Sequence, residues 1–263
     1  GHGEGGAGKA GSREVFGGHS HVGTMIYRGD NWPAEYRNHL FTLNLHGHQL
    51  NHQVNLREAG GYNTVHAGSD VLFCSDQQFI GVDLQVGPDG AVYISDWYDP
   101  RHCHNPNTEV WDRGNGRIYR MKYDANYQPV KVDYLSATDN QLVTALQHPN
   151  DWHARMAQRV LSERAARGTM STDVRPQLIT LATTDADASL RLRAVWALHT
   201  IGALDEKLTL RLLHDDSEYL RGWAIQLACE EEVSPSLAAS VVQQAQSDQS
   251  LFVRRYLASA IER

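Results

Sequence analysis

The chain has 263 residues, of which 41% are hydrophobic and 21% charged, and its net charge is −7. Acidic residues exceed basic ones in both halves, with 15 against 11 in residues 1–134 and 16 against 13 in residues 135–263. Neither half therefore offers the basic surface that nucleic-acid binding requires. No run of about 18 apolar residues occurs, so the sequence predicts no membrane-spanning helix.

Residues 1–18 are rich in glycine and begin without an initiator methionine. They contain no apolar stretch of the kind that forms a secretory signal. They also lack the Gly-Lys-Ser/Thr ending and the preceding strand of a phosphate-binding loop. We interpret these residues as a flexible linker or a loop exposed by truncation, and the whole chain as a piece of a longer protein.

Residues 19–135 are predicted to form short β-strands. β-Branched and aromatic residues and apolar alternation mark seven strands, at 21–28, 39–45, 49–56, 62–66, 79–86, 91–96 and 116–123. Turn signals separate the strands, among them Gly87-Pro88-Asp89-Gly90. This tight turn joins one strand to a second that ends on an aspartate, a pattern that recurs in the four-stranded blades of β-propellers. We therefore expect the last two blades of a β-propeller here.

From residue 136 to residue 263 the hydrophobic period changes from 2 to 3.6. Helices are predicted at 139–147, 151–167, 173–183, 188–201, 205–213, 217–230, 235–246 and 250–262. Every second helix carries an arginine followed by an apolar stripe, at Arg155, Arg193, Arg221 and Arg254. Spacings of 38, 28 and 33 residues are typical of arrays of helical hairpins. The fold class is thus β + α multidomain, with a HEAT-like α-solenoid of about four hairpins, cut short at its end, after the strands.

Histidine is the unusual residue type, because ten of the fourteen histidines precede residue 105. In a propeller, the start of the innermost strand and the loop after the second strand lie at the same end of the central channel. The expected blades would gather polar residues at that end. Candidate catalytic residues there are His21, His46 and Asp96, and candidate cofactor contacts are His19, His48, Asp76 and Asp99. This convergence points to a functional rim.

Each of these groups also has a structural interpretation. The His19–His21 pair can fix loops by hydrogen bonds, and Gly47 permits a tight turn between its flanking histidines. The segment from Asp96 onward has ligand types that suit a metal, with His102 and His104 as candidate ligands, but its spacing matches no established metal site. Structural roles are expected for His39, His52, the four helical arginines, and the pair Trp196 and Trp223.

The three cysteines give no disulfide framework. Cys74 and Cys103 can pair in an oxidising compartment or stay free, which the sequence leaves open. Cys229 is expected to be a small buried hydrophobe. Cys103-His104 resembles the end of a c-type haem motif, but position 100 is proline rather than cysteine. No haem site is therefore predicted in this segment.

Three stretches carry a family resemblance: residues 18–51, 80–106 and 111–123. Followed by a helical array, they resemble the large proteins of planctomycete-type bacteria known as membrane-bound dehydrogenases. Residues 32–47 are more distantly similar to the sorbosone and glucose dehydrogenase propellers that use pyrroloquinoline quinone. Members of the closer family typically carry an upstream propeller portion, then HEAT repeats, then a c-type haem domain.

The resemblance implies a periplasmic or envelope-associated redox protein. A quinone cofactor, pyrroloquinoline quinone with calcium, would take electrons from a sugar or alcohol and pass them to a haem domain in cis or to a cytochrome. Asp96 and the His46-Gly47 pair match motif positions of the closer family. Quinone-using propellers place arginines before the Pro-Asp-Gly turn to hold the cofactor's carboxylates, whereas residues 79–83 contain none.

Two hypotheses follow. In the first, the chain is part of a dehydrogenase whose rim histidines act as general base and cofactor contacts, and this fragment is not active alone. In the second, the chain is a non-catalytic scaffold that binds a carbohydrate, or a partner protein through the solenoid.

Overall fold

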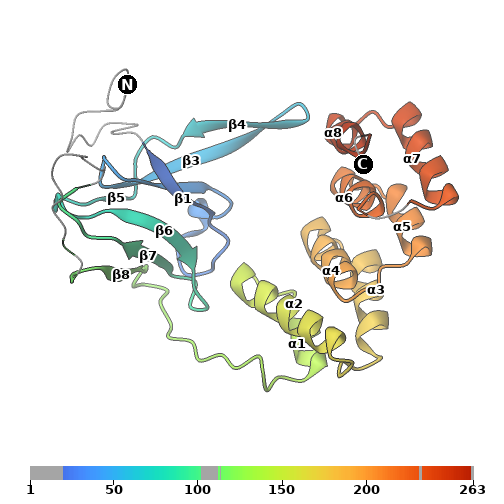
Figure 1. Ribbon diagram of the computed structural model, residues 1–263, viewed down its shortest axis with the longest axis horizontal. Coiled ribbons are helices and arrows are strands. Elements are labelled where there is room, and N and C mark those ends of the chain that lie inside the picture. Colours follow the sequence, from blue (N-terminus) through green and yellow to red (C-terminus); the bar gives the residue numbers. More distant parts are fainter. Residues whose placement is uncertain (1–19, 102–111, 113, 231–232, 262–263) are drawn as a thin grey trace. The chain divides into compact units, whose positions relative to one another are not determined.

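The computed structural model describes residues 20–101, 112, 114–230 and 233–261 (Figure 1). The described residues from Val132 onward, together with Arg57–Tyr62, form one compact unit, and the remaining described residues form another. We call the first the helical unit and the second the sheet unit. No helix in the described part of the chain is long and apolar enough to cross a membrane.

The strands follow the predicted order closely. They are β1 (His21–Ile26), β2 (Leu40–Asn44), β3 (Gln49–Glu58), β4 (Gly61–His66), β5 (Leu72–Phe73), β6 (Gly81–Val86), β7 (Val92–Asp96) and β8 (Arg117–Met121), with a short 3-10 helix, η1 (Ala34–Tyr36), between β1 and β2. All seven predicted strands are present, and the two-residue β5 is an addition.

Two antiparallel sheets make up the sheet unit. One has the strand order β1-β2-β3-β4, with β5 paired to the start of β3, and the other has the order β6-β7-β8. The first strands of the two sheets, β1 and β6, lie against each other. Gly23 in β1 has a φ of +52°, and a side chain there would place its Cβ only 2.9 Å from the Cα of Asp83. This close approach requires glycine.

The alternation of side chains gives the larger sheet two different faces. One face packs against the second sheet through an apolar core of Met25, Tyr27, Trp32, Phe41, Leu43, Leu50, Phe79, Leu84, Val92 and Ile94. The opposite face is polar yet buried, and carries Thr42, Asn44, Gln49, Asn51 and Gln53. Burial of so many polar side chains on one face is the feature from which the candidate site is built.

Tyr27 ties the two sheets together. Its hydroxyl donates to the carbonyl of Gly90, at 2.9 Å, and accepts from the backbone N–H groups of Asn31 and Trp32, at 3.0 and 2.7 Å. The ring of Trp32 stacks on that of Tyr27, with 4.8 Å between centroids. This buried hydroxyl makes all three of the hydrogen bonds that it can form. Its burial therefore avoids the free-energy cost of an unsatisfied polar group.

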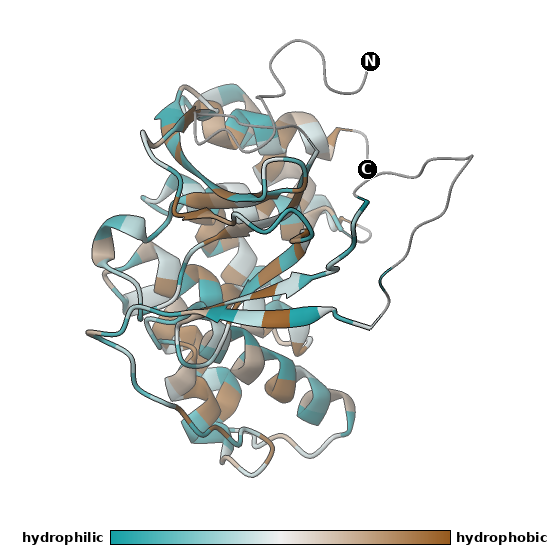
Figure 2. Ribbon diagram, turned by 90° about the vertical axis from the view of Figure 1, so that its left-hand side faces the viewer, coloured by the Kyte–Doolittle hydropathy of each residue, from teal (hydrophilic) through white to brown (hydrophobic). Residues whose placement is uncertain are grey.

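The helical unit contains α1 (Asp139–Ala145), α2 (Asp151–Ala166), α3 (Val174–Thr184), α4 (Ala188–Thr200), α5 (Glu206–Leu213), α6 (Glu218–Ala228), α7 (Pro235–Ser247) and α8 (Leu251–Ala260). Consecutive helices pair into four hairpins, and α2, α4, α6 and α8 pack in succession. Side-chain caps begin most helices, including a capping box between Thr138 and Gln141. Figure 2 shows hydrophobic and hydrophilic positions interleaved along the helices, as expected for faces buried between repeats.

Structural roles are confirmed for most of the predicted helical residues. Arg193 is buried, donates to the carbonyls of Leu146 and His148, each at 2.9 Å, and pairs with Asp151. Trp196 and Trp223 pack edge to face with 5.0 Å between centroids, and Cys229 is buried. Arg155 differs, because it is exposed and forms no ion pair within the described residues.

Candidate functional site

Three of the predicted rim residues meet around the segment that leads into β6. Nδ1 of His48, in the turn between β2 and β3, lies 2.7 Å from the carbonyl oxygen of Phe79. Asp96, at the end of β7, accepts from the backbone N–H of Ile80 at 2.8 Å, and the N–H of Asp99 donates to the carbonyl of Gln78 at 3.1 Å. The structure thus brings His48, Asp96 and Asp99 against residues 78–80.

Most of these groups bind backbone. Asp76 is exposed and its Oδ1 accepts from the N–H of Gln78 at 3.0 Å. Asp99 is buried and accepts from the backbone of Arg101 and the indole of Trp97. Asp96 is different, since it is only 5% exposed and its Oδ2 is buried with no hydrogen-bond partner among the residues that the structure describes. His46 lies half-buried in the turn after β2.

Three predicted site residues, His19, His102 and His104, lie outside the described residues, as does Cys103. Within the residues that the structure does describe, no three His, Cys, Asp or Glu side chains are placed to hold a metal ion.

A second polar cluster joins His21 to the buried face of the larger sheet. Nε2 of His21 lies 3.0 Å from Oδ1 of Asn51, which also accepts from Nδ2 of Asn44 at 3.2 Å. Nδ2 of Asn51 donates to Asp70 at 2.7 Å. The other carboxylate oxygen of Asp70 is 2.9 Å from Nε2 of His66. A continuous chain of hydrogen bonds therefore runs from His21 through Asn51 and Asp70 to His66.

This chain fixes where the protons lie. Asp70 can only accept, so the amide of Asn51 must turn its N–H group toward Asp70 and its oxygen toward His21. Nε2 of His21 must then donate, which leaves Nδ1 as the lone-pair nitrogen of the neutral ring. The exposed His21 is consequently oriented and presents a basic nitrogen.

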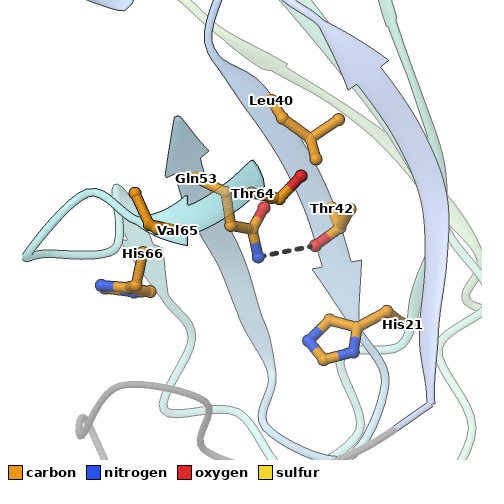
Figure 3. A pocket seen from close by; sticks show the side chains of 7 residues that line it. All are labelled: His21, Leu40, Thr42, Gln53, Thr64, Val65 and His66. Atoms are coloured by element: carbon orange, nitrogen blue, oxygen red, sulfur yellow. Dashed lines mark hydrogen bonds between the residues drawn. The ribbon is translucent and has the colours of Figure 1, made fainter. Parts of the chain in front are cut away.

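An open pocket of about 180 Å³ lies over this polar face (Figure 3). Its lining residues come from β1, β2, β3 and β4 and are His21, Leu40, Thr42, Gln53, Thr64, Val65 and His66. The amide of Gln53 donates to the hydroxyl of Thr42 at 3.5 Å, whereas its Oε1 is buried and has no partner within the part of the chain that the structure describes. The pocket therefore combines apolar side chains with one unsatisfied hydrogen-bond acceptor, Oε1 of Gln53.

The expectation that His39 and His52 are structural is consistent with their contacts. Nδ1 of His39 is 2.8 Å from Nε2 of His52, and the His52 ring stacks on Phe41 with 4.8 Å between centroids. Burial and the neighbouring His39 lower the pKa of His52 below its ordinary value of 6.5. The hydrogen bond to His39 and the stacking on Phe41 hold the ring of His52 in place.

Pyrroloquinoline quinone does not fit the described pocket. The cofactor carries carboxylates, which proteins hold with arginine or lysine, and the pocket lining contains neither. The nearest ionised group of the polar chain is the carboxylate of Asp70, which would repel an anion. Arg117 lies outside this pocket, near Asp96. Its guanidinium carbon is 4.0 Å from the centroid of the Tyr98 ring.

The sequence pointed to His21 but not to Asn51, Gln53, Asp70 and His66. One signal was available: Gln49, Asn51 and Gln53 alternate with apolar Leu50 and place amides on a single strand face. The partner Asp70 lies in the loop before β5, and only the folding of β5 onto β3 brings it beneath Asn51.

Comparison with known proteins gives two matches. No curated protein matches the chain significantly. Residues 140–229 match the family model for HEAT repeats, and residues 13–125 match the model for a domain of unknown function, DUF7133. The chain therefore contains a DUF7133 domain with antiparallel sheets, followed by a helical region built of HEAT repeats.

Proposed function

We propose that the sheet unit binds a small neutral polyol, such as a sugar or an alcohol, in the pocket beside His21. The observation that carries the proposal is the buried Oε1 of Gln53, which has no hydrogen-bond partner among the described residues. A buried acceptor without a donor costs on the order of 1–3 kcal/mol, and a ligand hydroxyl would remove that cost. Nδ1 of His21 adds a second acceptor, while Leu40 and Val65 offer apolar surface for the C–H face of a sugar ring.

The resemblance to the membrane-bound dehydrogenase family supports a proposal for the fold around this site, its protein partner and its location. We propose that the two sheets are blades of a β-propeller, because each is an antiparallel meander and their first strands lie together. The HEAT repeats suit contact with a protein, here a redox domain or cytochrome that follows or meets the helical unit. A periplasmic or envelope location belongs to the same proposal.

A second candidate function is oxidation of the bound alcohol. The fixed tautomer of His21 favours it, because the lone pair on Nδ1 could accept the hydroxyl proton while the hydride of the adjacent C–H bond passes to a quinone, which would give a carbonyl product and a reduced quinone. The electron acceptor would have to come from parts of the protein other than the described pocket.

Isothermal titration calorimetry of the whole chain against a panel of sugars and polyols tests binding. Gln53→Leu should weaken affinity about tenfold, the effect of one lost hydrogen bond. Gln85→Leu is the matched control, because Gln85 is exposed on the smaller sheet. Failure of the whole panel to bind, or equal effects of the two substitutions, would refute the binding site.

Dye reduction separates the two candidates. The longer protein, supplied with pyrroloquinoline quinone and calcium, should turn over the ligand that binds best if it is a dehydrogenase. His21→Gln should then abolish turnover, whereas the affinity should fall only severalfold because Gln53 and the apolar lining of the pocket remain. Binding without turnover in the unsubstituted protein would favour the scaffold.

A further inference from the structure

The second helices of the hairpins carry a ladder of arginines that link successive repeats. Arg191 in α4 donates to the carbonyl of Ala182 at 2.9 Å and forms a bidentate pair with Asp215, in the loop before α6. Arg221 in α6 donates to the carbonyl of Asp215 at 2.8 Å and pairs bidentately with Asp248, in the loop before α8, at 2.7 and 3.2 Å. Each arginine thus binds a backbone carbonyl of its own hairpin, in α3 for Arg191 and in the loop before α6 for Arg221, together with the aspartate of the following loop.

Arg254 in α8 occupies the third place in this ladder. Its Nε donates to the carbonyl of Asp248 at 3.0 Å, the contact to its own loop. Within the described residues no carboxylate completes the second contact. The aspartates of the ladder are recognisable, because Asp215 and Asp248 each stand two residues before a serine N-cap and accept from that serine's backbone N–H.

The apolar stripe beside each arginine repeats in the same way. Residues four and seven positions after Arg191 are Val195 and Leu198, which are 1% and 0% exposed. The residue four positions after Arg221 is Ile225, which is fully buried where α8 packs on α6. After Arg254 the equivalent residues are Ala258 and Ile261, which are exposed, Ile261 by 86%. On α7, Val242 is 57% exposed.

We infer that the outer face of α7 and α8 docks one further HEAT-like helical hairpin, which brings an aspartate to Arg254. The exposed stripe supplies the apolar contact, and the incomplete arginine supplies the charge complementarity. This occupant reproduces the geometry already seen twice in the chain, between α4 and α6 and between α6 and α8.

A tandem duplication tests the proposal. Arg221 and Arg254 are 33 residues apart, so a copy of residues 231–263 appended after residue 263 keeps the repeat register. The copied Asp248 then stands where the ladder requires it. Thermal unfolding of the extended chain should occur at least about 5 °C higher than that of the original chain, because an added repeat interface stabilises the array.

Three substitutions make the test specific to the ladder. Arg254→Gln should lower the Tm of the extended chain by about 2–4 °C, a loss of roughly 1 kcal/mol by the usual conversion, and leave the original chain within about 1 °C. Replacing the copied Asp248 by asparagine should have the same effect in the extended chain. Val242→Asp should remove most of the gain by charging the apolar stripe. An extended chain that melts with the original one, or an Arg254→Gln effect of equal size in both chains, would overturn the proposal.

Discussion

The two units of this chain bury polar groups in different ways. In the helical unit, Arg191, Arg193 and Arg221 each bind a carboxylate together with backbone carbonyls. In the sheet unit, one face carries buried amides and a hydroxyl beneath an open pocket, and among the described residues the Oε1 of Gln53 has no donor. Full pairing is what stability demands of buried polar groups. The contrast teaches that the helical arginines hold successive repeats together, whereas the incomplete pairing of Gln53 supports the ligand site proposed above.

The largest expected effect lies in the helical unit. Arg193→Ala removes a 7% exposed guanidinium that pairs with Asp151 and caps the carbonyls of Leu146 and His148. Breaking a buried pair by removing one partner should cost about 3–5 kcal/mol of unfolding free energy. Urea denaturation measures this loss. Arg155→Ala, at an exposed position of α2, is the control and should cost less than about 0.5 kcal/mol. Equal losses of unfolding free energy in the two variants would contradict a stabilising role for the buried ion pair.

The polar face of the sheet unit should be next in sensitivity. Asn51→Leu leaves the side chains of His21 and Asp70 without their shared partner, and should cost about 2–3 kcal/mol. The same substitution should free the ring of His21, so polyol affinity should fall as well. Urea denaturation and calorimetry on one variant report both effects. Asn55→Leu, at the partly buried continuation of β3, is the control, and equal losses there would remove the special role of Asn51.

Lowering the pH should destabilise the sheet unit before it destabilises the helical unit. Because the pKa of His52 is lowered by burial and by His39, the unfolded chain binds this proton more readily than the folded one. The stability from neutral His52 is therefore present above pH 6.5 and is lost as the pH falls from 6.5 through the lowered value. Urea unfolding followed by tryptophan fluorescence between pH 7.5 and 5 should show this slope, and His52→Gln should flatten it. A slope unchanged by that substitution would assign it to other groups.

The helical unit should keep its stability over the same pH range. Burial alone would raise the pKa of Asp248, but the hydrogen bonds from Arg221 and from the N–H of Ser250 outweigh it and lower the pKa below 3.8. The stability from this carboxylate is present above pH 3.8 and is lost only as the pH falls below that value. Helical circular dichroism should therefore hold at pH 5.

The smallest effect should come from an exposed pair on α2. Nε of Arg159 is 2.9 Å from Glu163, with 69% and 33% of the two side chains exposed. Glu163→Gln should change the unfolding free energy by less than about 0.5 kcal/mol, and salt should mask even that. A loss comparable to that of Arg193→Ala, measured by urea denaturation, would contradict the division between surface and buried pairs.

The sequence predicted the helices and strands better than it predicted the tertiary contacts between them. Alternation along residues 39–45 and the apolar period of residues 188–201 identify β2 and α4 nearly to their ends. The two residues of β5 show no period, because their pairing with Gln49 and Leu50 is set by tertiary folding. For the same reason the link from Asn51 to Asp70 could not be foreseen. Alternating amides in β3 would ordinarily indicate a solvated face, and only the structure shows that face to be buried.

The stacking of Trp32 on Tyr27 gives the protein an optical reporter of its own. Trp32 is 8% exposed and its indole N–H donates to the carbonyl of Met121, so its ring touches one sheet while its hydrogen bond reaches the other. Trp97, in contrast, is 57% exposed. Separation of the two sheets would move the emission of Trp32 to longer wavelength while that of Trp97 stays in place. Replacing the other five tryptophans, Trp97, Trp111, Trp152, Trp196 and Trp223, by phenylalanine would thus leave a chain whose tryptophan fluorescence follows the separation of the two sheets during unfolding.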